Sequence, residues 1–250
     1  MTDYYFLISS LPTLEFGKKP PIDFHQLFFS YKMNIEGKDF EKVRRFLLYF
    51  DCQNLVNLWR EKPLDPWGYL DKKGIDEALL VDTVLPDFVF DFLKKYPEKE
   101  QRITYFPELL SSFFKTMIYE EKGFLKDYFV LQRSIRLLKT AFFTEDVGKE
   151  LFFEDLSDLD IKDLLKRKNN YSDKRFDYKE LAKILGNQKL DPLTLYTEYM
   201  KFQFYMIDRL LIENPFSIDQ LIGYLAKLRI VEEMSKLDKE EGDKIVDEIA

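Results

Sequence analysis

The 250-residue sequence contains one cysteine and one histidine. A single cysteine cannot form a disulfide within the chain, which fits a reducing, cytoplasmic environment. A single histidine excludes a zinc site that needs two or more imidazoles, and a site built from four cysteines is excluded as well. We therefore expect the fold to be stabilised by packing, without internal disulfides or a structural zinc.

Glycine and proline are also scarce, with 9 and 10 residues respectively. So few breakers favour helices over a sandwich of many short strands joined by turns. The sequence contains no GxGxxG or GxxxxGK[ST] phosphate loop and no HExxH or GxSxG motif. It therefore predicts no catalytic residue, no cofactor-binding residue and no metal ligand, and the chain is not expected to be an enzyme.

Positive charge is in deficit, because 38 Lys and Arg face 45 Asp and Glu, for a net charge of −7. Nucleic acid is therefore not an expected partner, since phosphate neutralisation needs a basic face. The basic run at 164–175 is interpreted as a solvated loop, and the acidic run at 152–163 as a solvated helix face. No apolar run extends for about 18 residues without charge, so no membrane span is expected.

Aromatic residues are abundant, with 24 Phe and 15 Tyr, and predict a bulky core. Apolar positions recur at steps of three and four, and caps and prolines mark the ends of these runs. The fold class expected is all-α. The predicted helices lie near 24–31, 38–63, 85–97, 106–123, 124–143, 151–170, 191–215, 217–237 and 243–249.

Residues 4–17, "YYFLISSLPTLEFG", form an apolar opening with no basic residue before it. A signal peptide needs a basic region at its start, so we do not expect one here. We expect instead a short extended or helical opening that Pro12 ends. The residues expected to dock into the helical core are Tyr5, Leu7, Ile8 and Leu11.

Two reactive side chains have simpler structural interpretations. His25 lies beside aromatic residues and is interpreted as partly buried among them rather than as a general base, which would need a partner. Cys52 lies in an apolar stretch of a predicted helix. It is interpreted as a small core residue rather than as a nucleophile.

A tyrosine followed four residues later by a glutamine occurs at positions 49, 128 and 199, at spacings of about 79 and 71 residues. This weak repeat suggests three related helical units within a single domain spanning 1–250, at about 1–85, 86–170 and 171–250. Coincidence remains open as an alternative, because tyrosine is common in this chain.

Two stretches resemble the C-type subunit of V-type (archaeal/vacuolar-type) ATPases, called the coupling subunit below. Residues 51–63, "DCQNLVNLWREKP", resemble its D-x-x-N-L-x-x-L-x-R-x-K helix. Residues 215–234, "PFSIDQLIGYLAKLRIVEEM", resemble its closing helix. The opening "YYFLISSLP" is similar to the start of an uncharacterised bacterial family encoded in V-type ATPase operons.

The resemblance implies a funnel or socket of three helical units, seated on the membrane proteolipid ring and receiving the tip of the central rotor stalk. It implies a non-catalytic subunit, cytoplasmic and peripheral to the cell membrane, that transmits torque for ion transport coupled to ATP hydrolysis or synthesis. The central stalk subunits and the proteolipid ring are the partners expected. A free-standing helical adaptor and an enzyme that uses carboxylates alone remain as alternatives.

Overall fold

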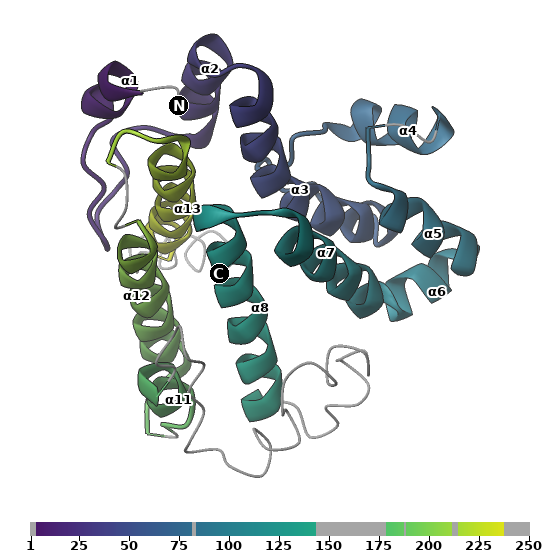
Figure 1. Ribbon diagram of the computed structural model, residues 1–250. Helices are drawn as coiled ribbons and strands as arrows, with labels where there is room; N and C mark the ends of the chain where they lie inside the picture. The colour runs from purple at the N-terminus through teal and green to yellow at the C-terminus, as the bar shows by residue number, and fades with distance from the viewer. Residues whose placement is uncertain (1–3, 82–83, 144–178, 188, 212–214, 238–250) are drawn as a thin grey trace, which may run out of the picture. The chain divides into compact units, whose positions relative to one another are not determined.

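The computed structural model describes residues 4–81, 84–143, 179–187, 189–211 and 215–237 (Figure 1). Over these residues the chain forms eleven helices and no strand, which confirms the all-α prediction. The helices expected at 151–170 and 243–249 lie outside the described residues. The acidic and basic runs within 152–175 lie outside them as well.

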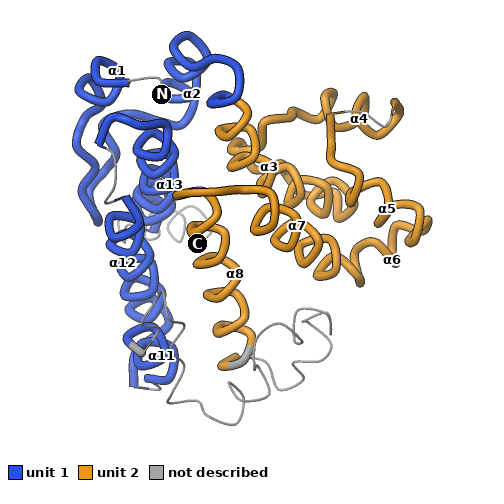
Figure 2. The backbone as a smooth tube through the Cα atoms, viewed as in Figure 1, with its two compact units in different colours: residues 1–40, 178–250 blue, residues 41–177 orange. Residues whose placement is uncertain are grey.

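The chain divides into two compact units, coloured separately in Figure 2. Unit 1 consists of residues 1–40 and 178–250, and unit 2 consists of residues 41–177. These boundaries differ from the divisions near residues 85 and 170 that the sequence repeat suggests. The boundaries differ because α2 (Phe24–Asn34), near the start of the sequence, packs against α13 (Ile218–Ser235), near its end, in unit 1. The three related helical units that the sequence repeat suggests stay a prediction.

In unit 1, helix α13 is buried along most of its length. The unit contains α1 (Tyr5–Ser10), α2 (Phe24–Asn34), α11 (Lys179–Leu185), α12 (Pro192–Leu210) and α13 (Ile218–Ser235). The buried side chains of α13 include Leu221, Ile222, Leu225, Leu228 and Val231. Helices α2 and α12 pack against α13, and α11 packs against α12.

Helix α12 begins where its sequence predicts. The Asp191 side chain accepts hydrogen bonds from the backbone N–H groups of Leu193 and Thr194, and Pro192 is the first helical residue. Proline is suited to this position because its fixed φ fits a helix and its missing N–H would have no helical partner. Helix α12 ends at Leu210 and packs against α13.

The opening of the chain is helical, but the residues that anchor it differ from those predicted. Within α1 no residue is buried, and the side chain of Phe6 is 87% exposed. The buried residues are Tyr4 and Leu14, on either side of α1. The Tyr4 N–H donates to the carbonyl of Phe216 at 2.9 Å, and the Tyr224 hydroxyl donates to the carbonyl of Pro12 at 2.8 Å.

Tyr5 is 50% exposed, so its predicted docking is wrong. Leu7, Ile8 and Leu11 are half-buried, so they are not enclosed in the core as predicted. Because α1 is a short helix between two anchored ends, its own side chains need not enter the core. The sequence pattern could not show this, because the anchoring groups belong to α13 and to the turn before it.

Unit 2 has an aromatic core. Its helices are α3 (Gly37–Trp59), which begins in unit 1, α4 (Lys72–Val81), α5 (Asp87–Lys95), α6 (Lys99–Thr104), α7 (Phe106–Glu120) and α8 (Gly123–Phe143). Helices α5, α6 and α8 all pack against α7. The rings of Phe113 and Phe129 meet edge to face at 5.2 Å, a favourable aromatic geometry.

Helix α3 ends four residues before the proline that was expected to end it. The chain turns at Glu61, whose φ of 56° is left-handed. The N–H of Lys62 bonds the carbonyl of Asn57 at 2.9 Å, and the N–H of Glu61 bonds that of Leu58 at 3.1 Å. This pair of bonds is typical of a Schellman ending, so Pro63 follows the end of the helix rather than causing it.

The two ends of the opening segment can be tested with a matched pair of substitutions. Leu14→Ala removes a buried side chain and should lower the free energy of unfolding by about 2–5 kcal/mol. Phe6→Ala changes an exposed side chain and should alter it by about 0.5 kcal/mol or less. Urea denaturation followed by circular dichroism measures both. Equal effects of the two substitutions would contradict this assignment of the anchors.

Candidate functional site

Helix α3 buries two polar side chains, Asp51 and Asn54, which are 3% and 1% exposed. Their spacing of three residues places them on the same side of the helix. Both reach residues 65–70, which lie within the connection between α3 and α4 and are called the docked segment below. A buried polar group costs free energy unless it is hydrogen-bonded, so the partners of these two side chains matter.

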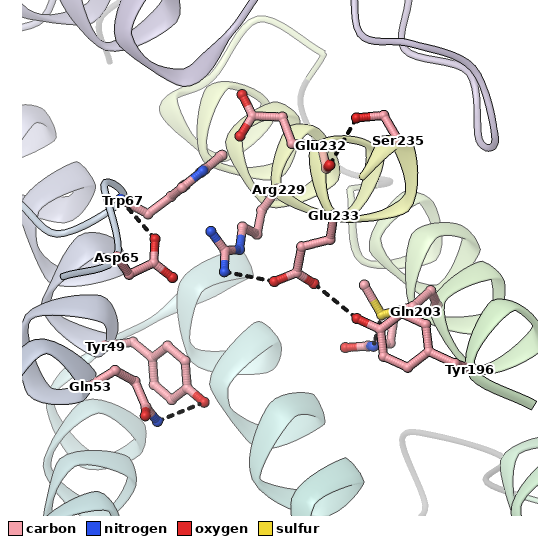
Figure 3. A network of polar contacts seen from close by, with 11 residues as sticks. Tyr49, Gln53, Asp65, Trp67, Tyr196, Gln203, Arg229, Glu232, Glu233 and Ser235 are labelled. Atoms are coloured by element: carbon pink, nitrogen blue, oxygen red, sulfur yellow. Dashed lines mark hydrogen bonds and ion pairs between the residues drawn. The ribbon is translucent and has the colours of Figure 1, made fainter. Parts of the chain in front are cut away.

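Asn54 holds the start of the docked segment by bonding one residue twice. Its Nδ2 donates to the carbonyl of Asp65 at 2.9 Å, and its Oδ1 accepts from the N–H of Asp65 at 2.7 Å. The carboxylate of Asp65 in turn accepts from the N–H of Trp67 at 3.0 Å (Figure 3). The Asn54 side-chain amide therefore satisfies both the N–H and the carbonyl of Asp65.

Asp51 holds the end of the docked segment. Its Oδ1 accepts from the N–H of Leu70 at 3.0 Å, and the N–H of Tyr69 also donates to this carboxyl. Trp67 is fully buried, and its ring lies 5.6 Å from that of Phe50. The segment is thus fixed by its backbone at both ends and by one large side chain in the middle.

Gly68 allows the close approach between the docked segment and α3. A Cβ atom added there would overlap Nδ2 of Asn54 and would lie 3.0 Å from Oδ1 of Asp51. Any side chain at position 68 would therefore push the segment away from the two groups that hold it.

A pocket of about 130 Å³ opens beside Asp51. Arg44 stacks its guanidinium over the ring of Tyr69 at 4.8 Å and pairs with Glu41 at 3.0 Å. The Nε atom of Arg44 is buried and has no hydrogen-bond partner in the described part of the chain. The other side chains that line the pocket are Arg45, Leu48, Leu70, Val84, Pro86, Thr116, Met117 and Glu120.

Burial raises the pKa of Asp51 from 3.8 to about 7, although the N–H groups of Leu70 and Tyr69 and the charge of Arg44 all lower it. A carboxyl group with such a pKa beside a pocket has the properties of a candidate general acid or base. Here, however, the carboxyl already accepts two backbone hydrogen bonds. The geometry therefore supports a role in holding the docked segment.

A second polar group lies in unit 1, on the segment that resembles the closing helix of the coupling subunit. Arg229 and Glu233 form an ion pair of 2.7 Å, and the Tyr196 hydroxyl donates to Glu233 at 3.4 Å (Figure 3). Burial, together with the charge of Glu233, raises the pKa of Tyr196 to about 12. The neighbouring Glu232 accepts from the N–H of Phe24 at 2.8 Å, at the start of α2.

The two reactive side chains interpreted from the sequence lie in different units. Cys52 is fully buried in α3, which confirms its core role, and burial raises the pKa of its thiol. His25 is exposed on α2, so the expectation of partial burial is wrong, although its ring lies 5.6 Å from that of Phe24.

The repeated tyrosine and glutamine make a hydrogen bond at their first occurrence, where Gln53 donates to the Tyr49 hydroxyl at 3.3 Å. At the third occurrence, Gln203 donates to the sulfur of Met200 at 3.3 Å. The two occurrences differ in these contacts, and the three related helical units suggested by the repeat stay a prediction.

The described residues contain no group of three or more His, Cys, Asp or Glu side chains placed to hold a metal ion. None of the described helices is long and apolar enough to cross a membrane.

In the sequence, Asp51 and Asn54 stand out only as part of the motif that resembles the coupling subunit, which does not indicate their structural role. The available signal was their position on a helix that is otherwise apolar, three residues apart. Such a pair predicts a buried polar contact, since the side chains must find partners. Its partner could not be identified, because backbone groups of a loop carry no sequence signature.

The profile of a family described as "Protein of unknown function (DUF2764)" matches residues 1–250. The chain belongs to this family. A similar protein from Chlamydia muridarum, named only as uncharacterized, is 24% identical over 244 residues, which covers 92% of each chain. Another from Chlamydia pneumoniae, also named uncharacterized, is 25% identical over 261 residues and covers 100% of this chain and 98% of its own. No solved structure matches the chain.

Gly68→Ala tests the close approach of the docked segment. The added methyl group should lower the free energy of unfolding by about 1–3 kcal/mol, because it overlaps Asn54. Gly74→Ala is the matched control, since Gly74 lies inside α4 and its added Cβ would come no nearer than 3.2 Å to a side-chain atom. Denaturation midpoints measure both variants, and a Gly68→Ala protein as stable as the Gly74→Ala protein would refute the packing described here.

Proposed function

We propose that this chain is a non-catalytic, peripheral subunit of a V-type ATPase. In that role it links the central rotor stalk to the membrane proteolipid ring and transmits torque between ATP hydrolysis or synthesis and ion translocation. It acts at the cytoplasmic side of the cell membrane and reaches the membrane through its partner subunits.

The observation that carries this proposal is the placement of the two segments that resemble the coupling subunit. Residues 51–59 form the buried second half of α3, and the Asp51 and Asn54 of their motif hold the docked segment. Residues 218–234 lie in α13, the helix of unit 1 with the most buried side chains. The resemblance therefore falls on residues that build the two units, as expected when a framework rather than a surface loop is shared.

Exposed apolar side chains give secondary support for partner binding. Side chains that are more than 60% exposed occur on helices of both units, namely Phe6, Phe29, Met33, Leu80, Val81 and Tyr119. Phe29 and Met33 are four residues apart on α2 and therefore lie on one face of that helix. Aromatic side chains and methionine are enriched at protein–protein interfaces, so such positions suit a subunit of an assembly.

Purification of the V-type ATPase from the native host tests the proposal. An affinity tag on a catalytic subunit captures the assembled enzyme from detergent-solubilised membranes, and mass spectrometry with labelled peptide standards quantifies this chain. The expected result is a fixed ratio to the central stalk subunits. A reciprocal capture through a tag on this chain should recover stalk and ring subunits together.

The decisive control is an intact, active complex. If such a complex contains a different coupling subunit and lacks this chain, the proposal fails. If the reciprocal capture instead recovers a stable assembly without ATPase subunits, the alternative of a free-standing helical adaptor is supported.

A further inference from the structure

We propose that the docked segment, residues 65–70, is a proton-controlled latch on α3, which is closed most tightly when Asp51 carries a proton and loosens when Asp51 ionises. The latch lies within unit 2 and does not depend on the proposed function. When it opens, Trp67 leaves the core and the α3 side of the pocket beside Asp51 becomes accessible.

The geometry of the segment defines a latch because side chains of α3 hold its backbone at both ends, while Trp67 and Tyr69 pack against Phe50 and Arg44 between them. Its backbone is bonded to α3 by two side chains, Asn54 at its start and Asp51 at its end. One of these, Asn54, does not titrate, so the first attachment is insensitive to pH. Asp51 is the only titratable side chain in these two attachments, and release at its end frees the part of the segment that contains Gly68 and Leu70.

The charged groups around Asp51 come from several elements. Helix α3 contributes Glu41, Arg44 and Arg45, and α7 contributes Glu120, all of which line the pocket. Arg44 favours the ionised form of Asp51, but it is also paired with Glu41, and Arg45 is paired with Glu120 at 2.8 Å and Glu121 at 2.6 Å. The positive charges near Asp51 are therefore largely neutralised by other carboxylates.

The direction of the pH effect follows from linkage. With the latch open, Asp51 lies on a solvated helix and has an ordinary pKa near 4, whereas burial in the closed latch raises its pKa to about 7. The closed form thus binds a proton that the open form releases between these two values. Opening becomes easier as the pH rises through this window and is independent of pH above it.

Amide hydrogen exchange measured by NMR tests the latch in the full-length protein. After correction for intrinsic exchange rates, protection of the Leu70 N–H should fall by up to about tenfold for each pH step of one between roughly pH 5 and pH 7. It should then level off. Leu55, which is buried in α3, should exchange more slowly than Leu70 throughout, because it does not depend on the latch.

Two carboxyl-to-amide substitutions supply the matched comparison. Asp51→Asn removes the titrating group and should abolish the pH dependence of Leu70 protection. Asp71→Asn changes an exposed carboxylate that also accepts a backbone hydrogen bond, from Gly74 at 2.7 Å, and should leave the pH dependence intact.

Three outcomes overturn the proposal. These are Leu70 protection that does not change with pH, the same pH dependence in wild type and Asp51→Asn, and equal protection of Leu70 and Leu55, which indicates global unfolding. If Asp51→Asn does not fold, the carbon-13 shift of the Asp51 carboxyl in the wild-type protein decides the matter. A titration midpoint near 4 excludes the latch, and a midpoint near 7 that matches the change in Leu70 protection supports it.

Discussion

The need to satisfy two buried polar side chains on one helix determines much of unit 2. Asp51 and Asn54 lie inside a helix whose other buried residues are apolar, and both are shielded from solvent. The backbone of the docked segment supplies the missing partners, and this forces the chain to turn back along α3 immediately after it ends. Trp67 then reaches the core, and α4 begins from a position that the turn has already fixed. Leaving a buried polar group without a partner costs more free energy than a hydrogen bond gains, so loss of this contact should destabilise the unit.

Unit 1 is held together by a similar use of isolated polar groups, here between segments far apart in the sequence. The Tyr31 hydroxyl donates to the carbonyl of Leu221 at 2.7 Å, in a buried site. Glu232 accepts from the N–H of Phe24, and Tyr224 donates to the carbonyl of Pro12. Each of these bonds joins α13 to the first part of the chain. They give the apolar packing of the two segments a defined register, which hydrophobic contact alone specifies poorly.

Local signals in the sequence were sufficient for the fold class and for most helices. The Asp191–Pro192 start of α12 is an example, because a cap acts on residues that follow it directly. Helices α4, α6 and α11 were not predicted, and each has 10 residues or fewer. The anchoring of the opening through Tyr4 and Leu14, and the contacts of Asp51, depend on distant partners. Those partners are largely backbone groups, which every residue possesses and no sequence pattern distinguishes.

The discontinuity of unit 1 has a consequence for how this protein folds during synthesis. Residues 41–177 can form unit 2 as soon as they leave the ribosome, because its contacts lie within one continuous stretch. Residues 4–40 emerge earlier but lack α13, so Tyr4, Leu14 and Tyr31 stay uncovered until the ribosome has translated the intervening unit. The first part of the chain is therefore made first and folded last. Apolar surface that stays exposed during synthesis is prone to aggregation, so the late arrival of α13 sets how long this part of the chain is at risk.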